Sequence, residues 1–548
     1  MAGSSKAGLS KKRQATSPQV NANSDDAHLR APQQFLLFAL FFAGLMLLHA
    51  PLLRLPYFWD EAGYYVPAAR DLYLTGTLVP HSTPSSLHPP LVMAWLALAW
   101  RVAGYSTLVT HTAMLAMAAF ALLGLFRLAR AASNSRIAWA TTLLVAIYPV
   151  FFMQSSLAQV DLPAAGFTFW ALLAYLEDRS WKMVAWFSLA TVTKETAIVA
   201  PAALFAWQWI ATEVAKRKTG ASSRWPAIAP PPNRRTRLIH LFLPVFALAA
   251  WFAYHYAKTG HVFGSPDFFR YNVTEALNPL RIPLAFVLRL WQVIGYFGLY
   301  LLTLAGILAM FRPPQSENGT PRPRIAPWKL AAFAAVLLAY LLFMSAVGGA
   351  ELARYLLPVV PLVILAWVST LWRRVRYWTL VVGVVAVAIV AGLFINPPYG
   401  FSLEDNLAYR DYVIMHADAA RFLAMTNPNA RVLTAWPASD ELTRPWLGYT
   451  PQPFYVVRLE DFSAPQIELA SLAKGRYDVA LAFSTKYRPS HPLLQNWMAW
   501  QHLKERFFGY HHDLSPEEIA QRLGGKVIFQ KNASGQWVAV IGFVQNRE

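Results

Sequence analysis

The sequence QFLLFALFFAGLMLLHAPLL, residues 34–53, contains no Asp, Glu, Lys or Arg over a length that matches one crossing of a bilayer. About 20 consecutive apolar residues are needed to span the hydrocarbon core as a helix. Comparable apolar runs recur as far as Ile395, and hydrophobic residues make up 56% of the 548-residue chain, against 14% for charged residues. Because about 25% of residues are charged in ordinary globular proteins, the composition predicts a polytopic α-helical membrane protein.

These runs predict about eleven transmembrane helices between residues 34 and 395. The run at 89–103 is shorter than the roughly 20 residues that one crossing needs, so we expect it to form a helix that lies at the outer membrane surface. The alternative is a true crossing, which would invert the orientation of every later span and spoil the sorting of charge. Residues 1–33 have the composition of a disordered cytoplasmic tail. The expected spans lie near residues 34–53, 107–126, 137–154, 164–177, 183–193, 196–211, 238–256, 284–310, 330–346, 355–371 and 377–395.

The distribution of charge predicts the orientation of these spans. The chain carries 48 basic and 29 acidic residues, a net charge of +19, and all of that excess lies before Asn396. Basic clusters alternate with connections that are poor in positive charge, which is the pattern of positively charged cytoplasmic loops. The N-terminus is therefore expected in the cytoplasm and the C-terminal part outside, on the periplasmic side of a bacterial inner membrane. Basic residues dispersed between spans do not form the single patch that nucleic-acid binding requires.

Residues 396–548 differ in kind from the hydrophobic part. Strand-like runs alternate there with amphipathic helical patterns, which predicts a small extracytoplasmic α/β domain. The chain has no cysteine, so disulfides and thiol chemistry are excluded. The expected strands are Arg431–Trp436, Phe454–Leu459, Tyr477–Phe483, Lys526–Gln530 and Trp537–Val544, and the expected helices lie near 407–425, 464–474 and 515–523.

An acidic pair, Asp60-Glu61, follows the first span within the segment Pro56–Tyr65. Aromatic neighbours would raise the proton affinity of a carboxylate there and make it usable as a general base. The alternative is an interfacial acidic pair that caps the following helix.

Three further ionisable residues are expected near the outer face, where charges at membrane depth mark candidate functional sites. Asp161 lies between two spans, where it could also serve as the N-cap of the next helix. Lys194 separates two short spans and could bind a phosphate or pair with Glu195. Arg354 begins a late span and could also pair with Glu351, one turn away.

Histidines lie in the same outer connections. His88 precedes Pro89-Pro90-Leu91, and His255 and His261 flank a short turn. Histidines at such spacing bind a metal ion only where carboxylates converge with them.

Five motifs in this order resemble the GT-C superfamily of polyprenyl-phosphate-sugar glycosyltransferases, and among them the protein O-mannosyltransferase-like and lipid A aminoarabinose transferase branches. The resemblance covers roughly residues 34–395. The motifs are Asp60-Glu61-x-x-Tyr64, His88-Pro89-Pro90-Leu91, Asp161, Thr193-Lys194 and Arg354-Tyr355-Leu356-Leu357-Pro358.

The resemblance implies an inverting transfer of a hexose or pentose from a polyprenyl phosphate, without a nucleotide cofactor, to an extracytoplasmic glycan, lipid or protein. Asp60, with Glu61 beside it, would be the catalytic carboxylate. Tyr64, His88, Lys194, Arg354 and Tyr355 would bind the lipid phosphate and sugar. A divalent metal ion is also compatible with these residues, and its expected ligands would be Asp161, His255 and His261.

Two positions depart from the aminoarabinose branch. Gly63 stands where an arginine is common, and His88 stands where a lysine usually precedes Pro-Pro-Leu. Both changes remove permanent positive charge from the expected phosphate region. A membrane transporter or flippase for a lipid-linked or anionic substrate is the alternative function, although the candidate charges near one face favour surface chemistry over a permeation path.

Overall fold

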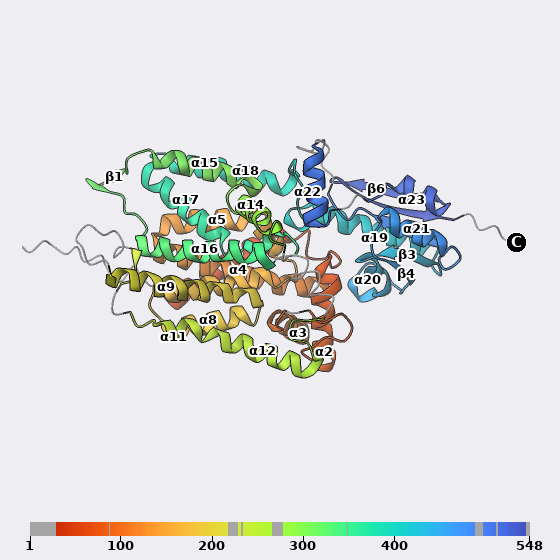
Figure 1. Cartoon of the computed structure of the whole chain (residues 1–548), viewed down its shortest axis with the longest axis horizontal. Coiled ribbons are helices and arrows are strands. Elements are labelled where there is room, and N and C mark those ends of the chain that lie inside the picture. The colour runs from red at the N-terminus through yellow and green to blue at the C-terminus, as the bar shows by residue number, and fades with distance from the viewer. Residues whose placement is uncertain are drawn as a thin grey trace, which may run out of the picture.

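A helical bundle is followed along the chain by a five-stranded sheet at one end of the molecule (Figure 1). The computed structural model describes residues 29–86, 88–217, 228–231, 234–265, 278–347, 349–487, 497–510 and 513–543. Most of the predicted N-terminal tail, residues 1–28, lies outside these residues. Helix α1 (Ala31–His49) begins two residues before Gln33, where the tail was expected to end.

The bundle consists of α1 and the apolar helices that follow it. They are α4 (Thr107–Ala132), α5 (Ser135–Ile147), α7 (Asp161–Leu176), α8 (Ser180–Thr191), α9 (Val199–Arg217), α11 (Leu238–Phe242), α12 (Pro244–Thr259), α14 (Arg281–Ile294), α15 (Leu299–Met310), α16 (Pro327–Val347), α17 (Val360–Arg374) and α18 (Trp378–Phe394). Three shorter helices lie towards the sheet, namely α2 (Val66–Thr75), α3 (Leu91–Ala103) and α6 (Pro149–Gln154). Strands β1 (Ser316–Glu317) and β2 (Thr320–Pro321) form a small hairpin at the opposite end.

Six helical segments among the described residues are long and apolar enough to cross a membrane, and four shorter apolar helices accompany them. The mostly helical, membrane-type fold is thereby confirmed, while the number of eleven spans stays a prediction. Helix α3, in the run expected to lie flat at the outer surface, has 13 residues and packs against α2 and α4.

Two of the expected spans are broken in the structure. The span 137–154 divides at Tyr148, which has an extended backbone and is followed by Pro149. The ring of a proline disfavours the helical conformation at the residue before it. The span 284–310 divides into α14 and α15 at Phe297 and Gly298, which both have positive φ. The segment after α6 and helix α14 both contribute to the site described below.

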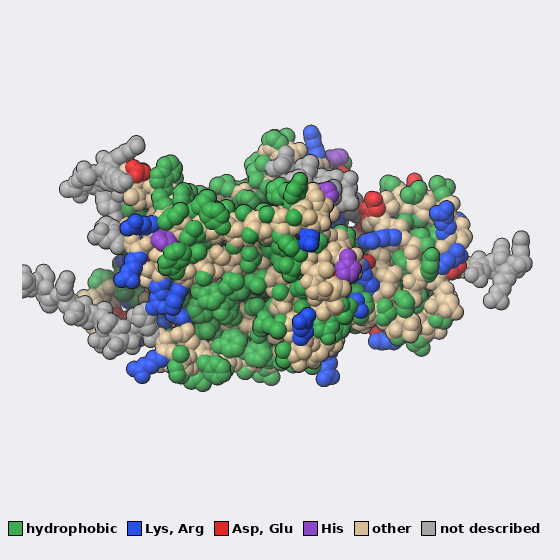
Figure 2. Space-filling model, turned by 90° about the horizontal axis from the view of Figure 1, so that it is seen from below, with side chains coloured by type: hydrophobic (Ala, Val, Ile, Leu, Met, Phe, Trp, Pro, Cys, Tyr) green, Lys and Arg blue, Asp and Glu red, His purple; other side chains and the backbone are tan. Residues whose placement is uncertain are grey.

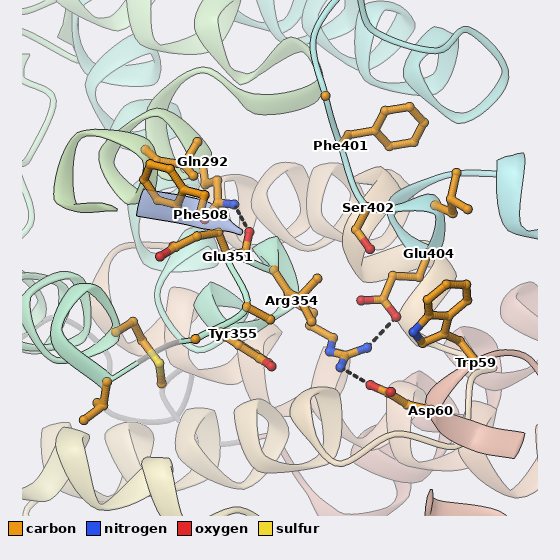
Figure 3. A pocket seen from close by; sticks show the side chains of 18 of the residues that line it. Trp59, Asp60, Gln292, Glu351, Arg354, Tyr355, Phe401, Ser402, Glu404 and Phe508 are labelled. Atoms are coloured by element: carbon orange, nitrogen blue, oxygen red, sulfur yellow. Dashed lines mark hydrogen bonds and ion pairs between the residues drawn. The ribbon is translucent and has the colours of Figure 1, made fainter. Parts of the chain in front are cut away.

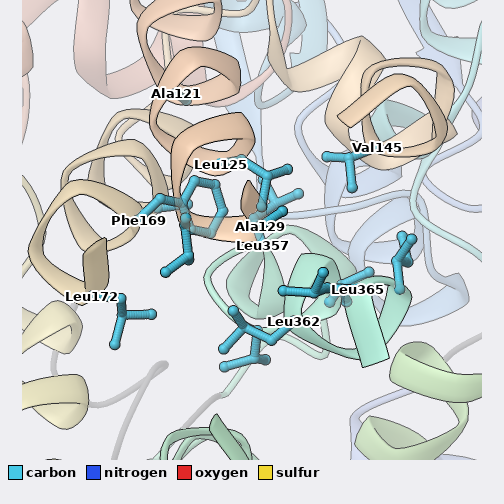
Figure 4. Close-up of a cluster of buried hydrophobic side chains, with 14 of the residues drawn as sticks. Ala121, Leu125, Ala129, Val145, Phe169, Leu172, Leu357, Leu362 and Leu365 are labelled. Atoms are coloured by element: carbon cyan, nitrogen blue, oxygen red, sulfur yellow. The ribbon is translucent and has the colours of Figure 1, made fainter. Parts of the chain in front are cut away.

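The core of the bundle forms where α4, α5, α7 and α17 meet. Its buried side chains are aliphatic and aromatic, and several are drawn in Figure 4. Small residues allow α4 and α7 to approach closely, since a Cβ added at Gly166 would lie 2.8 Å from the Cβ of Ala121. Close backbone approach through small residues is typical of helix pairs in membranes.

Large apolar side chains also cover the outside of the bundle, as Figure 2 shows. On α1 alone, Phe35, Leu36, Leu40, Leu47 and Leu48 are each more than half exposed. Soluble monomers rarely expose contiguous apolar patches of this kind. The surface therefore fits contact with lipid chains.

Basic residues from separate connections gather at the end of the bundle that carries β1 (Figures 1 and 2). Arg136 lies 3.1 Å from Glu317, and the Lys329 ammonium donates a hydrogen bond of 2.6 Å to the carbonyl of Ala131. Arg374 donates a hydrogen bond of 2.9 Å to the carbonyl of Met310, the last residue of α15, in the same region. The clusters assigned to one side from the sequence thus meet at one end, and the cytoplasmic location of that end stays a prediction.

The segment after α18 folds into α19 (Ala408–Thr426) and a mixed sheet in the order β4-β3-β5-β7-β6. Strand β3 pairs in parallel with β4 and β5, whereas β7 is antiparallel to β5 and β6. The predicted strands and helices are confirmed within a few residues, although the division of the chain at residue 396 stays a prediction. The bounds are β3 (Arg431–Ala435), α20 (Ala438–Thr443), β4 (Tyr455–Leu459), α21 (Ala464–Leu472), β5 (Val479–Phe483), α22 (Met498–Phe508), α23 (Pro516–Leu523), β6 (Lys526–Ala533) and β7 (Gln536–Gly542).

The packing of α4 on α7 can be tested by adding side-chain volume at Gly166. We expect Gly166→Val to destabilise the purified protein by about 1–3 kcal/mol, as overpacking does in other cores, and to lower its thermal unfolding temperature in detergent. Gly44→Val on α1 is the matched control, because no atom lies within 4 Å of the Cβ that it would add. Equal unfolding temperatures for the two variants would contradict the close packing.

Candidate active site

A cavity of about 1720 Å³ lies where the helical bundle meets the sheet. It exceeds the roughly 300–1,000 Å³ of ordinary small-molecule pockets. Six of the ten residues predicted for the site line it, namely Asp60, Tyr64, His88, Lys194, Arg354 and Tyr355.

The side chain of Arg354 is the centre of the polar part of this cavity (Figure 3). It belongs to the short 3₁₀ helix η6 (Ala353–Leu356) and is only 2% exposed. One terminal nitrogen donates to Asp60 Oδ2 at 2.5 Å, and the other donates to Gln159 Oε1 at 2.5 Å and to Glu404. The Nε atom lies 3.2 Å from Asp161 Oδ2. Three carboxylates from distant parts of the chain therefore surround one guanidinium.

Lys194 supplies the second cation of the site. Its ammonium pairs with Asp161 and lies 4.0 Å from the ring centroid of Tyr355. Asp161 thus lies between Lys194 and Arg354, and its side chain does not cap α7, whose N-cap residue is Val160. The two alternatives weighed for these residues, an N-cap role for Asp161 and a Lys194–Glu195 pair, do not describe the contacts seen here.

The conformation of the backbone places Asp60 at the cavity wall. Trp59 has a φ of 43°, which is uncommon for a residue other than glycine. A short π-helix, η2 (Glu61–Tyr65), follows directly, and π-helical turns occur frequently at functional sites. The Asp60 side chain is 19% exposed, and Arg354 holds only one of its two oxygens among the contacts described. The second oxygen is thereby available to a substrate.

Glu61 does not join this site, so its predicted place beside Asp60 as a catalytic carboxylate is wrong. Its side chain is fully buried and accepts hydrogen bonds from the backbone amides of Phe58 at 2.9 Å and Ala158 at 2.6 Å. His111 Nε2 lies 3.5 Å from its Oε1. Successive residues of a helical turn point in different directions. Asp60 therefore faces the cavity, whereas Glu61 holds the loops around it through backbone hydrogen bonds.

The predicted metal ligands Asp161, His255 and His261 do not converge. Asp161 faces two cations, while His255 Nε2 bonds to Ser85 at 2.7 Å and its Nδ1 faces the carbonyl of His261 at 2.7 Å. Within the described ranges, no three His, Asp or Glu side chains are grouped so that they could hold a metal ion. The proposed ligand set is therefore wrong, and no step below depends on a metal.

His88 and Glu351 have partners that sequence spacing did not predict. His88 Nδ1 lies 2.8 Å from Glu195 Oε2 at the cavity wall. Glu351 pairs with Arg281 at 2.7 Å and Arg289 at 2.9 Å rather than with Arg354. The loop before Arg354 is therefore fixed to α14, which leaves the guanidinium to the three carboxylates.

Glu404 is the site residue that the sequence analysis missed. It lies in the short 3₁₀ helix η7 (Leu403–Asp405), lines the cavity, and accepts hydrogen bonds from Arg354 and from Gln159, the latter at 3.0 Å. One signal could have identified it, because Glu404-Asp405 follows the last span as Asp60-Glu61 follows the first.

Burial alters the acidity of this second acidic pair. It raises the pKa of Glu404, an effect that the nearby Arg354 guanidinium opposes. Burial, reinforced by the negative charge of Glu404, raises the pKa of Asp405 to about 8. The Tyr296 hydroxyl donates a hydrogen bond of 2.7 Å to Asp405 and opposes this rise.

Asp405 should make folding stability depend on pH. Its carboxyl ionises near pH 4 in the unfolded chain and near pH 8 in the folded protein, so over that window the unfolded state binds fewer protons. Stability is therefore expected to fall as pH rises from about 4 to 8. Asp405→Asn should remove part of this fall, and thermal unfolding of both proteins in detergent at pH 5 and pH 8.5 measures it. If the two proteins lose the same stability over this interval, Asp405 does not hold its proton in the fold.

The comparisons with known proteins agree on the fold. The family model described as dolichyl-phosphate-mannose-protein mannosyltransferase matches residues 87–229. The crystal structure of ArnT from Cupriavidus metallidurans in the apo state superposes with a TM-score of 0.53 at 15% identity, covering 92% of this chain and 97% of that one. The structure of the same protein bound to undecaprenyl phosphate gives a TM-score of 0.50 at 14% identity, covering 93% and 98%. No curated protein sequence matches this chain.

The two structural likenesses run along nearly the whole chain, whereas the family model matches residues 87–229 alone. The chain has the fold of the GT-C glycosyltransferases, and its resemblance to that superfamily is confirmed by the family model and the shared architecture.

Proposed function

We propose that this protein is an inverting membrane glycosyltransferase, which moves one sugar from a polyprenyl-phosphate donor to an extracytoplasmic acceptor. The observation that carries the proposal is the convergence of Asp60, Lys194 and Arg354 in one cavity that also has a long apolar wall. The structure of Cupriavidus ArnT with undecaprenyl phosphate bound supports a polyprenyl-phosphate donor.

The apolar wall suits a prenyl chain. It is formed by Leu248 and Phe252 of α12, by several residues of α14, and by Phe343 and Met344 of α16. Helices α12 and α16 expose other large apolar residues at the surface of the bundle. A lipid tail could therefore lie along this wall while its phosphate reaches the polar part of the cavity.

In the proposed reaction, the oxygen of an acceptor hydroxyl attacks the anomeric carbon of the donor. The bond between that carbon and the phosphate oxygen breaks, its electron pair stays on the phosphate, and the hydroxyl proton moves to Asp60. The products are the glycosylated acceptor and polyprenyl phosphate. A single displacement inverts the anomeric configuration and needs one base, unlike the two-carboxylate retaining scheme.

The two cations have different parts in this scheme. Lys194 is a compact charge with three donors, of which Asp161 takes one, so it can meet the growing negative charge on the phosphate. The donors of Arg354 face protein oxygens. We therefore assign Arg354 to holding Asp60 rather than to binding phosphate directly, a change from the role that the family resemblance implied.

The proposal includes the side of the membrane at which transfer takes place. The basic end of the bundle is assigned to the cytoplasm and the cavity to the opposite, extracytoplasmic side. The charged groups of the cavity all lie towards the sheet end, which fits chemistry at one face better than transport across the bilayer.

Asp60→Asn is the direct test of the proposed base. Loss of a general base lowers turnover by roughly 10²–10⁴-fold, and we expect a loss of that size in the release of polyprenyl phosphate from a lipid-linked sugar in the presence of membrane acceptors. Glu468→Gln is the control, because that carboxylate is exposed and does not line the cavity. Wild-type turnover by Asp60→Asn, with unchanged expression, would show that another group is the base.

A further inference from the structure

The sheet contributes directly to the cavity through the ends of its parallel strands. Strand β3 ends at Ala435 and β5 ends at Phe483, and the residues that follow them, Trp436 and Thr485, line the cavity. Ligands of open α/β sheets bind beyond the carboxyl ends of parallel strands. The edge of the sheet that faces Asp60 is therefore the edge at which a ligand is expected.

Three aromatic side chains meet at this edge beside the proposed base. Trp59 and Trp436 have ring centroids 5.3 Å apart at an interplanar angle of 79°, and Tyr64 lies 5.9 Å from Trp436. All three line the cavity and none of them is fully buried. We name them the aromatic subsite.

Gly63 makes room for the central ring of this subsite. A Cβ at position 63 would lie 2.7 Å from Cζ2 of Trp436, closer than carbon atoms normally approach. The indole thus packs directly on the backbone of η2, the turn that follows Asp60. Glycine at this position, one of the two departures from the aminoarabinose branch, is explained by the presence of Trp436.

We propose that the aromatic subsite binds a sugar ring of the acceptor, so that the acceptor is a carbohydrate. The faces of aromatic rings carry a partial negative charge and attract weakly positive groups. The C–H bonds on one face of a sugar ring are such groups. A ring held against Trp436 would present a hydroxyl to Asp60, which adjoins Trp59 in the chain. This inference rests on the proposed function, because it names the substrate that accepts the transferred sugar.

The location of the aromatic subsite distinguishes an acceptor from the donor. In Figure 3, Trp59 lies on the opposite side of Arg354 from Gln292 of α14 and Phe508 of α22. The apolar wall assigned to the prenyl chain includes α14, so the lipid and the aromatic subsite flank the base from two sides. This arrangement suits a displacement in which the acceptor and the leaving phosphate lie on opposite sides of the anomeric carbon.

A peptide acceptor fits the sheet less well. Peptides commonly bind by adding a strand to an exposed sheet edge, and the edge strands here are β4 and β6. Among the described residues, neither of these strands contributes to the lining of the cavity. The aromatic ends of the central strands do, and they offer ring faces rather than main-chain hydrogen bonds.

The experiment is donor-free binding of the purified full-length protein, in nanodiscs, to an array of bacterial cell-envelope glycans and a matched array of Ser- and Thr-containing peptides. We expect binding to a subset of glycans and not to peptides. Trp436→Ala should weaken that binding at least tenfold, and Trp436→Phe should weaken it less because a ring remains. Gly63→Ala should also weaken it by displacing the indole. The control is Tyr455→Ala, an exposed aromatic residue at the other end of a parallel strand.

Three results would overturn the inference. The wild type would bind no glycan, it would bind peptides instead of glycans, or the wild type and Trp436→Ala would bind glycans equally well. An increase in the donor KM of Trp436→Phe without a change in glycan binding would assign the subsite to the donor sugar and would also overturn it. Asp60→Asn separates this inference from the proposed function, since it should lower transfer by roughly 10²–10⁴-fold and leave glycan binding intact. Thermal unfolding of each variant identifies any loss that reflects misfolding.

Discussion

The arrangement of the whole site depends on one buried guanidinium. Arg354 interacts with Asp60 after the first long helix, with Asp161 at the start of α7, and with Glu404 after α18. Burial of these charges is costly unless each has a partner, and removal of one member of a buried ion pair costs about 3–5 kcal/mol. The cluster therefore holds segments from 50 to 294 residues away from Arg354 in one geometry, and all three carboxylates share this cation, although Asp161 also pairs with Lys194.

This arrangement explains how a carboxylate can pair with a buried cation and still face the cavity. Arg354 holds one oxygen of Asp60, while the cavity exposes part of the side chain. Glu404 and Asp161 also pair with the Arg354 guanidinium. Arg354 therefore orients Asp60 without its positive charge being neutralised by Asp60 alone. Lys194 pairs with Asp161 at the edge of this cluster and lines the cavity, and it is the cation to which the proposed function assigns the phosphate.

Sequence reasoning could reach the fold class because its signals are local. Apolar runs indicate the helices, alternating charge indicates that the basic connections share a side, and strand periodicity predicted the sheet after α18. The meeting of Asp60, Lys194 and Arg354 followed from assigning all three to one membrane face. The breaks at Tyr148 and Phe297 were harder to predict, because the apolar runs continue through them.

The errors concern directions and partners, which spacing does not determine. Asp60 and Glu61 are adjacent but point to different surroundings, and His255 is engaged by Ser85 and the backbone of His261 rather than by a carboxylate. Glu404 and Trp436 reach the site because the segment after α18 lies against the end of the bundle (Figure 1). Gly63 was read as a lost positive charge, whereas its contact with Trp436 shows that it provides space.

The central claim, that Asp60 and Arg354 meet in one cavity at the sheet end, can be tested in native membranes because the chain contains no cysteine. The double variant Asp60→Cys with Arg354→Cys should be joined by a short bifunctional thiol reagent, and the cross-linked peptides can be identified by mass spectrometry. The pair Asp60→Cys with Arg374→Cys, which places the second thiol at the far end of α17, should not be joined. Cross-linking of this second pair, or its absence from the first, would contradict the account.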